Sequence, residues 1–220
     1  MEKISLNFAN RTLTLAIRDE ADQSVMREIF KFGEYRIAEP TIKTAKIIID
    51  AGAHAGFFTM YARALNKTAK IIAIEPEKAN IEALEHHLKT NPITGVKIIK
   101  KALANKTEKR DFFISKDSHN HSFTQTHNST PTEVDSINLR DIIKQDKISL
   151  LKMDIEGAEE EIIHSLTKDD YAKIEAIVME YHNPRTIKKL ESILRENRFK
   201  VQIFPSQFDK KMGFLFAKQA

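Results

Sequence analysis

A glycine-containing turn between two β-branched runs constrains this chain more than any other feature. The pattern runs in order through the isoleucines 47–49, the turn 50–56, a second apolar run at 71–74 and the carboxylate of Glu75. Many α/β sheets hold an adenosine ribose with this arrangement: an acidic strand end, a glycine turn, a helix, and a carboxylate about 20 residues further on. Gly52 and Gly56 permit a tight turn, and the helix from about Phe57 presents free N–H groups. The sequence therefore predicts an α/β sheet with a site for a nucleoside-containing cofactor.

The composition of the turn bears on which cofactor this is. A dinucleotide carries a pyrophosphate, and its fingerprint uses three glycines to bring the backbone close to those anions. Here the spacing is G-x-x-x-G, and Asp50 stands immediately before the turn, where a negative side chain disfavours a pyrophosphate. S-adenosylmethionine has no phosphate and carries an ammonium and a sulfonium. The turn therefore favours this methyl donor over a nicotinamide cofactor, and we expect the Asp50 carboxylate near the donor's cationic end.

Strand and helix patterns alternate along most of the chain, which predicts an α/β fold: a mainly parallel sheet with helices on both faces. We expect a hairpin at 4–8 and 12–17 and a helix near 25–30. Further strands are expected at 46–50, 70–75, 96–100, 110–115, 148–154, 174–180, 201–204 and 213–217, with helices at 56–66, from 76, at 159–166 and at 186–197. Only eight residues join the last two strands, too few for a parallel crossover, so these should form an antiparallel hairpin. The polar stretch 116–132 is predicted to be a long loop that can fold over a substrate.

Composition limits the class of protein. The chain has 220 residues, 41% of them apolar and 30% charged, as expected for one soluble domain, and it contains no cysteine for disulfides or thiolate chemistry. No apolar run has the length of a membrane span, so we expect a cytoplasmic protein without a membrane partner. The net charge is +4, and the densest basic stretch lies within residues 97–110. That stretch reads as a solvated edge more readily than as an RNA-binding surface, because no aromatic-rich basic motif accompanies it.

Candidate catalytic residues follow the fourth and fifth strands of the expected core. Ligands of open α/β sheets bind beyond the carboxyl ends of the strands, where Asp154, Glu156 and His182 are expected. Asp154 and Glu156 point the same way in an extended segment and raise each other's pKa, so one of them, or His182, can serve as a base. They can equally hold a divalent cation such as Mg²⁺, but spacing alone assigns no metal ligand set. Alternatively, Glu156 caps the next helix, whose first residues include Glu159.

Three motifs and their flanks resemble the FkbM-type S-adenosylmethionine-dependent methyltransferases. The resemblance rests on residues 48–56, 73–76 and 151–159 (Leu-Lys-Met-Asp-Ile-Glu-Gly-Ala-Glu), and also on residues 17–19, 22, 27–30, 34–36 and 179–182. It implies a Rossmann-like class I methyltransferase fold, a mainly parallel seven-stranded sheet with a C-terminal antiparallel hairpin. Residues 137–141 depart from the family's pattern, because Arg140 stands where the family has an acidic residue. The residues expected to bind the donor are Asp50, Gly52, Ala53, Gly56, Phe57, Glu75, Pro76, Ala104 and Asp154.

These observations together predict one methyltransferase domain over residues 1–220, with a hairpin and helix in 1–36 and a Rossmann-like core in 45–220. The expected reaction is O-methylation of a hydroxylated small molecule or a sugar, with S-adenosylmethionine as cofactor and a small-molecule or glycan acceptor as partner. Two alternatives remain open at this point: an RNA methyltransferase and a nicotinamide-dependent oxidoreductase. The sequence leaves the oligomeric state open.

Overall fold

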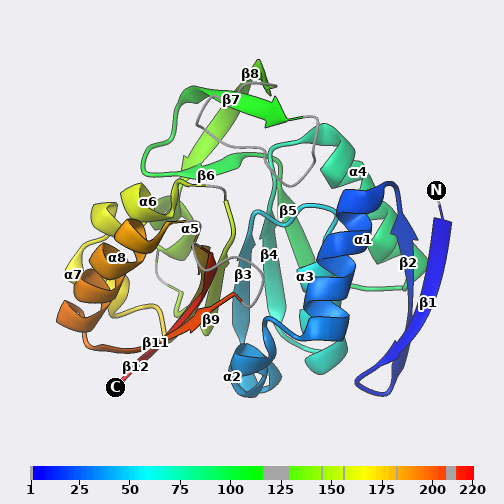
Figure 1. Cartoon of the computed structure of the whole chain (residues 1–220), viewed down its shortest axis with the longest axis horizontal. Coiled ribbons are helices and arrows are strands. Elements are labelled where there is room, and N and C mark those ends of the chain that lie inside the picture. The colour runs from blue at the N-terminus through cyan, green and yellow to red at the C-terminus, as the bar shows by residue number, and fades with distance from the viewer. Residues whose placement is uncertain (1, 116–128, 145, 156, 182, 207–211) are drawn as a thin grey trace.

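The computed structural model describes residues 2–115, 129–144, 146–155, 157–181, 183–206 and 212–220. Its main sheet has seven strands in the order β11-β12-β10-β9-β3-β4-β5 (Figure 1). Their bounds are β3 Ile47–Ala51, β4 Lys70–Ile74, β5 Val96–Ile99, β9 Leu150–Met153, β10 Ala176–Tyr181, β11 Phe199–Pro205 and β12 Gly213–Gln219. Only β12 runs against its neighbours in this sheet, pairing antiparallel with both β10 and β11. The predicted parallel sheet with a C-terminal antiparallel hairpin is confirmed.

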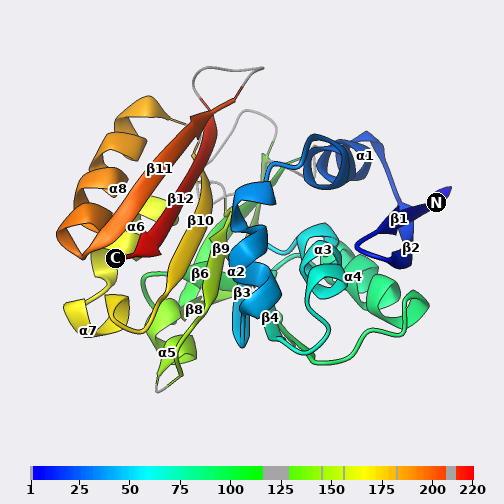
Figure 2. The ribbon, with the colours of Figure 1, turned by 90° about the horizontal axis from the view of Figure 1, so that it is seen from below.

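Helices cover both faces of the main sheet (Figure 2). Two consecutive isoleucines show why β3 is apolar on both faces: Ile48 packs into one core cluster and Ile49 into the other, on opposite faces of the sheet. The face of Ile48 is covered by α2 (Glu39–Thr44) and α3 (Phe57–Leu65), with α4 (Lys78–Thr90) beside α3. The face of Ile49 is covered by α5 (Leu139–Ile143), α6 (Glu159–Ser165), α7 (Lys168–Tyr171) and α8 (Pro184–Glu196).

The N-terminal segment forms the predicted hairpin and helix. Strands β1 (Glu2–Phe8) and β2 (Arg11–Ile17) pair antiparallel, and α1 (Glu20–Arg27) continues into a π-helical turn at Glu28–Phe32. The segment packs on the main sheet's helices, since Phe8 stacks on Tyr61 of α3 at 4.7 Å between ring centroids. The predicted boundary between 1–36 and 45–220 stays a prediction.

A smaller sheet, which the sequence did not predict in this form, projects beyond one end of the main sheet (Figure 1). It contains β6 (Ala102–Ala104), β8 (Ser129–Asn138) and β7 (Lys109–Ser115), in that order. The predicted loop 116–132 is therefore wrong at 129–132, which pair with β7; residues 116–128 lie outside the described part of the chain. Exposed side chains at Thr132, Glu133 and Asp135 explain the error, because a hairpin arm needs few apolar residues.

Candidate active site

The glycine turn after β3 requires both of its glycines. Gly52 has φ +71°, and a Cβ there would lie 1.7 Å from the carbonyl oxygen of Asp154. Gly56 has φ +86°, and a Cβ there would lie 2.2 Å from Cδ1 of Leu84 in α4. The N–H groups of Gly52 and Ala53 both donate to the carbonyl of Ile74, at 3.0 Å each. The turn is therefore fastened to the last residue of β4, directly before Glu75.

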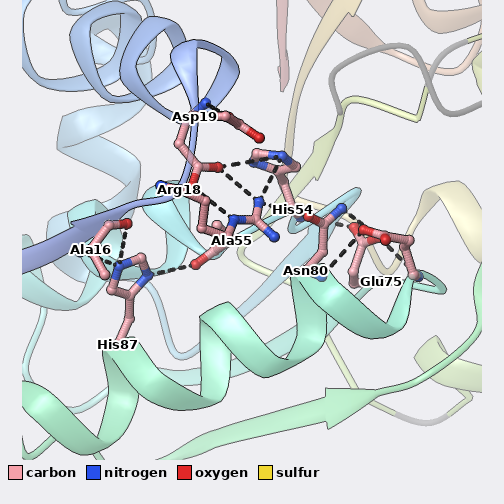
Figure 3. Close-up of polar contacts among 10 residues, drawn as sticks. Ala16, Arg18, Asp19, His54, Ala55, Glu75, Asn80 and His87 are labelled. Atoms are coloured by element: carbon pink, nitrogen blue, oxygen red, sulfur yellow. Dashed lines mark hydrogen bonds and ion pairs between the residues drawn. The ribbon is translucent and has the colours of Figure 1, made fainter. Parts of the chain in front are cut away.

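Glu75 is a buried carboxylate, only 4% exposed, at the carboxyl end of β4. Its Oε2 accepts the backbone N–H of His54 at 2.8 Å, and its Oε1 accepts the N–H of Glu77 at 3.0 Å and the Asn80 amide at 3.3 Å (Figure 3). Burial raises the pKa of Glu75 to about 7, against the effect of these three donors. A carboxylate has about four lone-pair positions, so acceptor capacity remains beside the glycine turn.

Asp50 lies beneath the turn, fully buried at the end of β3. One carboxylate oxygen accepts the Thr59 hydroxyl at 2.7 Å, and the other lies 3.3 Å from Nζ of Lys152 in β9. Burial raises the pKa of Asp50, and the neighbouring ammonium opposes this shift. The Asp50 carboxylate, which the sequence predicts near the cationic end of the donor, is thus paired with the ammonium of Lys152.

Lys152 connects the carboxylates to the turn. Its Nζ donates to the carbonyl of Gly52 at 2.7 Å and of Ala51 at 3.3 Å, and lies 3.6 Å from Oδ2 of Asp154. Burial lowers the pKa of Lys152, but the charges of Asp50 and Asp154 raise it more, so the side chain stays an ammonium. This buried cation fixes the path of the turn, which is the indirect way in which Asp50 can act on a ligand.

Asp154 follows β9 and is the more accessible carboxylate, with 29% of its side chain exposed. Its Oδ2 accepts the Tyr35 hydroxyl at 3.5 Å, and its N–H donates to the Ala51 carbonyl at 3.2 Å. Burial, followed by the charge of Asp154, raises the pKa of Tyr35 well above its usual value, so Tyr35 remains a phenol. Asp154 therefore lies between an ammonium and a hydroxyl donor, at the carboxyl edge of the sheet.

Two of the three expected catalytic residues, Glu156 and His182, lie outside the described residues. The segment between β9 and α6 is held by Glu159, whose carboxylate accepts the N–H groups of Ile155 at 3.0 Å and Gly157 at 2.9 Å. The sequence places Glu159 only as a favourable charge at the start of α6. Its contacts with Ile155 and Gly157 show that it also holds the backbone at these two positions.

A sequence model described as the methyltransferase FkbM domain matches residues 50–201. The chain belongs to the FkbM methyltransferase family. Two fungal relatives carry the same activity in their names. Methyltransferase sdnD of Sordaria araneosa is 24% identical over 229 residues and covers 88% of each chain. Methyltransferase 1 of Beauveria bassiana is 23% identical over 252 residues and covers 100% of this chain and 98% of its own.

Solved structures share the fold of this FkbM methyltransferase at low sequence identity. The human methyltransferase 10 domain containing protein has a TM-score of 0.54 at 14% identity, covering 94% of this chain and 88% of its own. An rRNA methylase from Streptococcus thermophilus has a TM-score of 0.54 at 11% identity, covering 84% and 96%. A Streptococcus mutans protein in complex with S-adenosylhomocysteine (SAH) has a TM-score of 0.52 at 11% identity, covering 85% and 98%. The fold is that of class I methyltransferases, as expected, and membership of the family sets aside the oxidoreductase alternative.

The remaining residues that the sequence predicts at the donor site occupy varied positions. Ala53 and Ala104 are buried, the latter at the end of β6, and Pro76 is half-buried after Glu75. Phe57 is buried at the start of α3, with its ring centroid 5.4 Å from that of His87. Their contact with a donor stays a prediction.

Three groups of this site escaped the sequence reasoning: Tyr35, Lys152 and Asn80. Lys152 left the clearest signal, a charged residue in the middle of an otherwise apolar strand that ends in an acid. A lysine there is buried only if a carboxylate compensates it. Tyr35 and Asn80 reach the site through tertiary contacts that no local pattern reports.

No helix in the described ranges combines the length and apolarity needed to cross a bilayer.

Proposed function

We propose that this FkbM methyltransferase transfers the methyl group of S-adenosylmethionine to a hydroxyl of a small molecule or a sugar. The observation that carries the proposal is the placement of two different carboxylates at one sheet edge. Glu75 is buried against the glycine turn, as a ribose partner must be, whereas Asp154 is partly exposed. A cytoplasmic location stays a prediction.

The donor fits the residues around the turn. Glu75 retains acceptor capacity for ribose hydroxyls, and Gly52 lets the turn pack directly against the Asp154 carbonyl, where any side chain would collide. Glu75 would hold the ribose, and the turn around Gly52 and Ala53 would lie beside the methionine portion. When bound, the donor supplies a methyl group that its sulfonium already activates. The protein then has to align the acceptor and remove its proton.

On the acceptor side, Asp154 would take the hydroxyl proton as the acceptor oxygen attacks the methyl carbon. Tyr35 and Lys152 contact the same carboxylate oxygen and hold it in place, which leaves its second oxygen for the acceptor. Glu156 and His182 are the other proposed participants. Because spacing fixes no third carboxylate or amide beside Asp154 and Glu156, we propose a base rather than a Mg²⁺ site. Activity that a chelator abolishes and magnesium restores would reverse that choice.

Contacts within the basic stretch favour a small acceptor over RNA. Lys100 pairs with Glu85 at 2.8 Å, and Lys109 with Glu133 at 2.6 Å. Arg110 pairs with Glu161 at 2.6 Å. Basic side chains that already have acidic partners offer less to a phosphate backbone.

The test is incubation of the purified protein with methyl-labelled S-adenosylmethionine and a cell extract divided into metabolites, glycans and RNA. We expect label in the metabolite or glycan fraction, in a form resistant to the conditions that cleave methyl esters, and much less label with Glu75→Ala at the same donor concentration. Label confined to RNA would transfer the assignment to the RNA alternative. Absence of label together with absence of SAH binding would refute the donor assignment itself.

A further inference from the structure

The N-terminal segment meets the donor site through one arginine. Arg18 directly follows β2. Its guanidinium donates two hydrogen bonds of 2.8 Å to the Asp22 carboxylate of α1, one from Nε and one from Nη2. The Arg18 backbone N–H adds a third bond to Asp22, at 2.9 Å. Asp22 is fully buried, so the pair is a rigid unit whose fork geometry leaves little freedom to the guanidinium.

The same guanidinium determines which end of Asn80 faces Glu75. Arg18 Nη2 donates to Asn80 Oδ1 at 2.8 Å, and the amide nitrogen of Asn80 then points to Glu75 at 3.3 Å (Figure 3). A guanidinium can only donate, so it accepts no other orientation of the Asn80 amide. The Asn80 amide could present either its oxygen or its nitrogen to Glu75. Arg18 binds the oxygen, so the nitrogen becomes the donor to the Glu75 carboxylate.

A second route runs from Arg18 to Glu75 through the glycine turn. Arg18 Nη2 lies 3.3 Å from Nε2 of His54, and the backbone N–H of His54 is the closest donor to Glu75, at 2.8 Å. His54 has φ +52°, a left-handed conformation that an L residue keeps only when its surroundings hold it there. The contact with Arg18 is one of those that hold it.

His87 of α4 fixes the segment at another point. The Ala16 N–H of β2 donates to His87 Nε2 at 2.8 Å, so the ring proton is on Nδ1 and is donated to the Ala55 carbonyl at 2.7 Å. Strand β2 and the glycine turn are thereby joined through one neutral imidazole. The segment is held on both sides of Arg18, which limits how far Arg18 can move from Asn80.

We propose that Arg18 is a positioning residue for the ribose of the methyl donor. It aims the Asn80 amide and the His54 N–H at Glu75, which fixes the carboxylate in the orientation that receives the ribose hydroxyls. Residues 11–27 thus complete the donor site although they precede the matched residues 50–201. This inference rests on the proposed function, in which Glu75 holds the ribose.

The test separates positioning from general support of the fold by asking whether Arg18 matters for the ribose alone. Calorimetry would compare the binding of SAH with that of its 2′,3′-dideoxy analogue. We expect the wild type to prefer SAH at least tenfold, because hydrogen bonds to a charged acceptor are lost in the analogue. In Arg18→Met this preference should shrink by about tenfold, mainly through weaker binding of SAH.

Two further variants keep the test decisive. Arg18→Lys retains a cation opposite the buried Asp22 but lacks the fork that reaches Asn80, so it should fold and still lose most of the ribose preference. Arg195→Met in α8 is the matched control, since Arg195 also bonds an acidic residue four positions away, Glu191, at 2.9 and 2.8 Å. It should leave the preference unchanged.

Each outcome has one meaning. If the wild type does not bind SAH, the proposed function fails. If the wild type prefers SAH but the folded Arg18 variants keep the full preference, or lose affinity for both ligands equally, Arg18 only supports the fold and this inference is wrong. If Arg18→Met does not fold, the result with Arg18→Lys decides.

Discussion

Replacing Lys152 with methionine isolates the role of the buried cation. Methionine keeps the length and apolar stem of lysine but removes the charge that faces Asp50 at 3.3 Å. Asp50, which is fully buried, then keeps the Thr59 hydroxyl as the partner at 2.7 Å but loses its ammonium. Removing one partner of a buried ion pair costs about 3–5 kcal/mol, a large part of the roughly 5–15 kcal/mol that stabilises a domain.

In Lys152→Met, Asp50 can take up a proton instead of staying charged and unpaired. The free energy of this protonation is therefore an upper limit to the cost of losing the ammonium, and it depends on pH. A carboxyl with a usual pKa of about 3.9 takes up a proton at pH 7 for about 4 kcal/mol, and at pH 5 for about 1.5 kcal/mol. The pKa of Asp50 is raised by burial and rises further without the ammonium. A carboxyl whose pKa is raised on folding lowers the stability of the folded protein as pH increases from its unfolded pKa to its folded pKa. The difference in the free energy of unfolding between Lys152→Met and the wild type should thus be smaller at pH 5 than at pH 7 by about 2.5 kcal/mol.

A double-mutant cycle identifies the partner. Asp50→Asn alone leaves Lys152 with Asp154 at 3.6 Å and two carbonyl acceptors, so its cost should be smaller. In the double variant no charge is left stranded, and we expect it to be more stable at pH 7 than Lys152→Met, with a coupling of about 2–3 kcal/mol.

Urea unfolding followed by circular dichroism at pH 5 and pH 7 measures these differences. Lys189→Met is the control, because Lys189 pairs with Glu160 on the surface and should change stability by less than about 1 kcal/mol. A loss in Lys152→Met that is equal at both pH values, or costs that add in the double variant, would show that packing and not the charge pair holds the turn.

Further predictions concern Glu75, the acceptor side and His87. Glu75→Ala should weaken SAH binding by well over tenfold. Because the pKa of Glu75 is about 7 and its carboxylate is the proposed ribose partner, wild-type affinity should rise about tenfold between pH 6 and pH 8, a dependence that calorimetry of Glu75→Gln should not show. Asp154→Asn should lower turnover by about 10²–10⁴ with nearly intact donor affinity; full turnover in both Glu156→Gln and His182→Ala would exclude those two as bases. Burial lowers the pKa of His87, so the folded protein resists its protonation and loses stability as pH falls below about 6.5; the melting temperature of His87→Phe should change less over that range.

The sequence predicted the strands of the main sheet and the longer helices, and it missed the short helices, β6 and the start of β8. The central strands β3, β4, β9 and β10 were found because they bury both faces and therefore read as largely apolar runs. Helices α2, α5 and α7 have 6, 5 and 4 residues, too few for a 3.6-residue period to show. The first residues of β8, 129–132, were assigned to a loop because polar residues occur in an exposed hairpin as readily as in a loop.

The candidate site also contains residues that the sequence could predict and residues that it could not. Gly52, Gly56 and Glu75 stand in one local pattern, so their proximity follows from a single strand–turn–helix–strand unit. The partners that determine their chemistry come from afar: Lys152 bonds Gly52 across 100 positions, and Arg18 bonds Asn80 across 62. Such pairs depend on how segments pack, and a single sequence carries no periodicity that reports them.

Three carboxylates at one sheet edge show why this distinction matters for function. Asp50, Glu75 and Asp154 all end or follow a strand, and strand position alone makes them equivalent. Their surroundings do not: Asp50 faces a buried ammonium, Glu75 is held by three N–H donors, and Asp154 is partly open between an ammonium and a phenol. Environment sets the reach of a carboxylate, and in the proposed function it divides the three into one that shapes the turn, one that would hold a ribose and one that would take the acceptor's proton. A reaction that needs a rigid donor site and a basic acceptor site can be built from this single residue type.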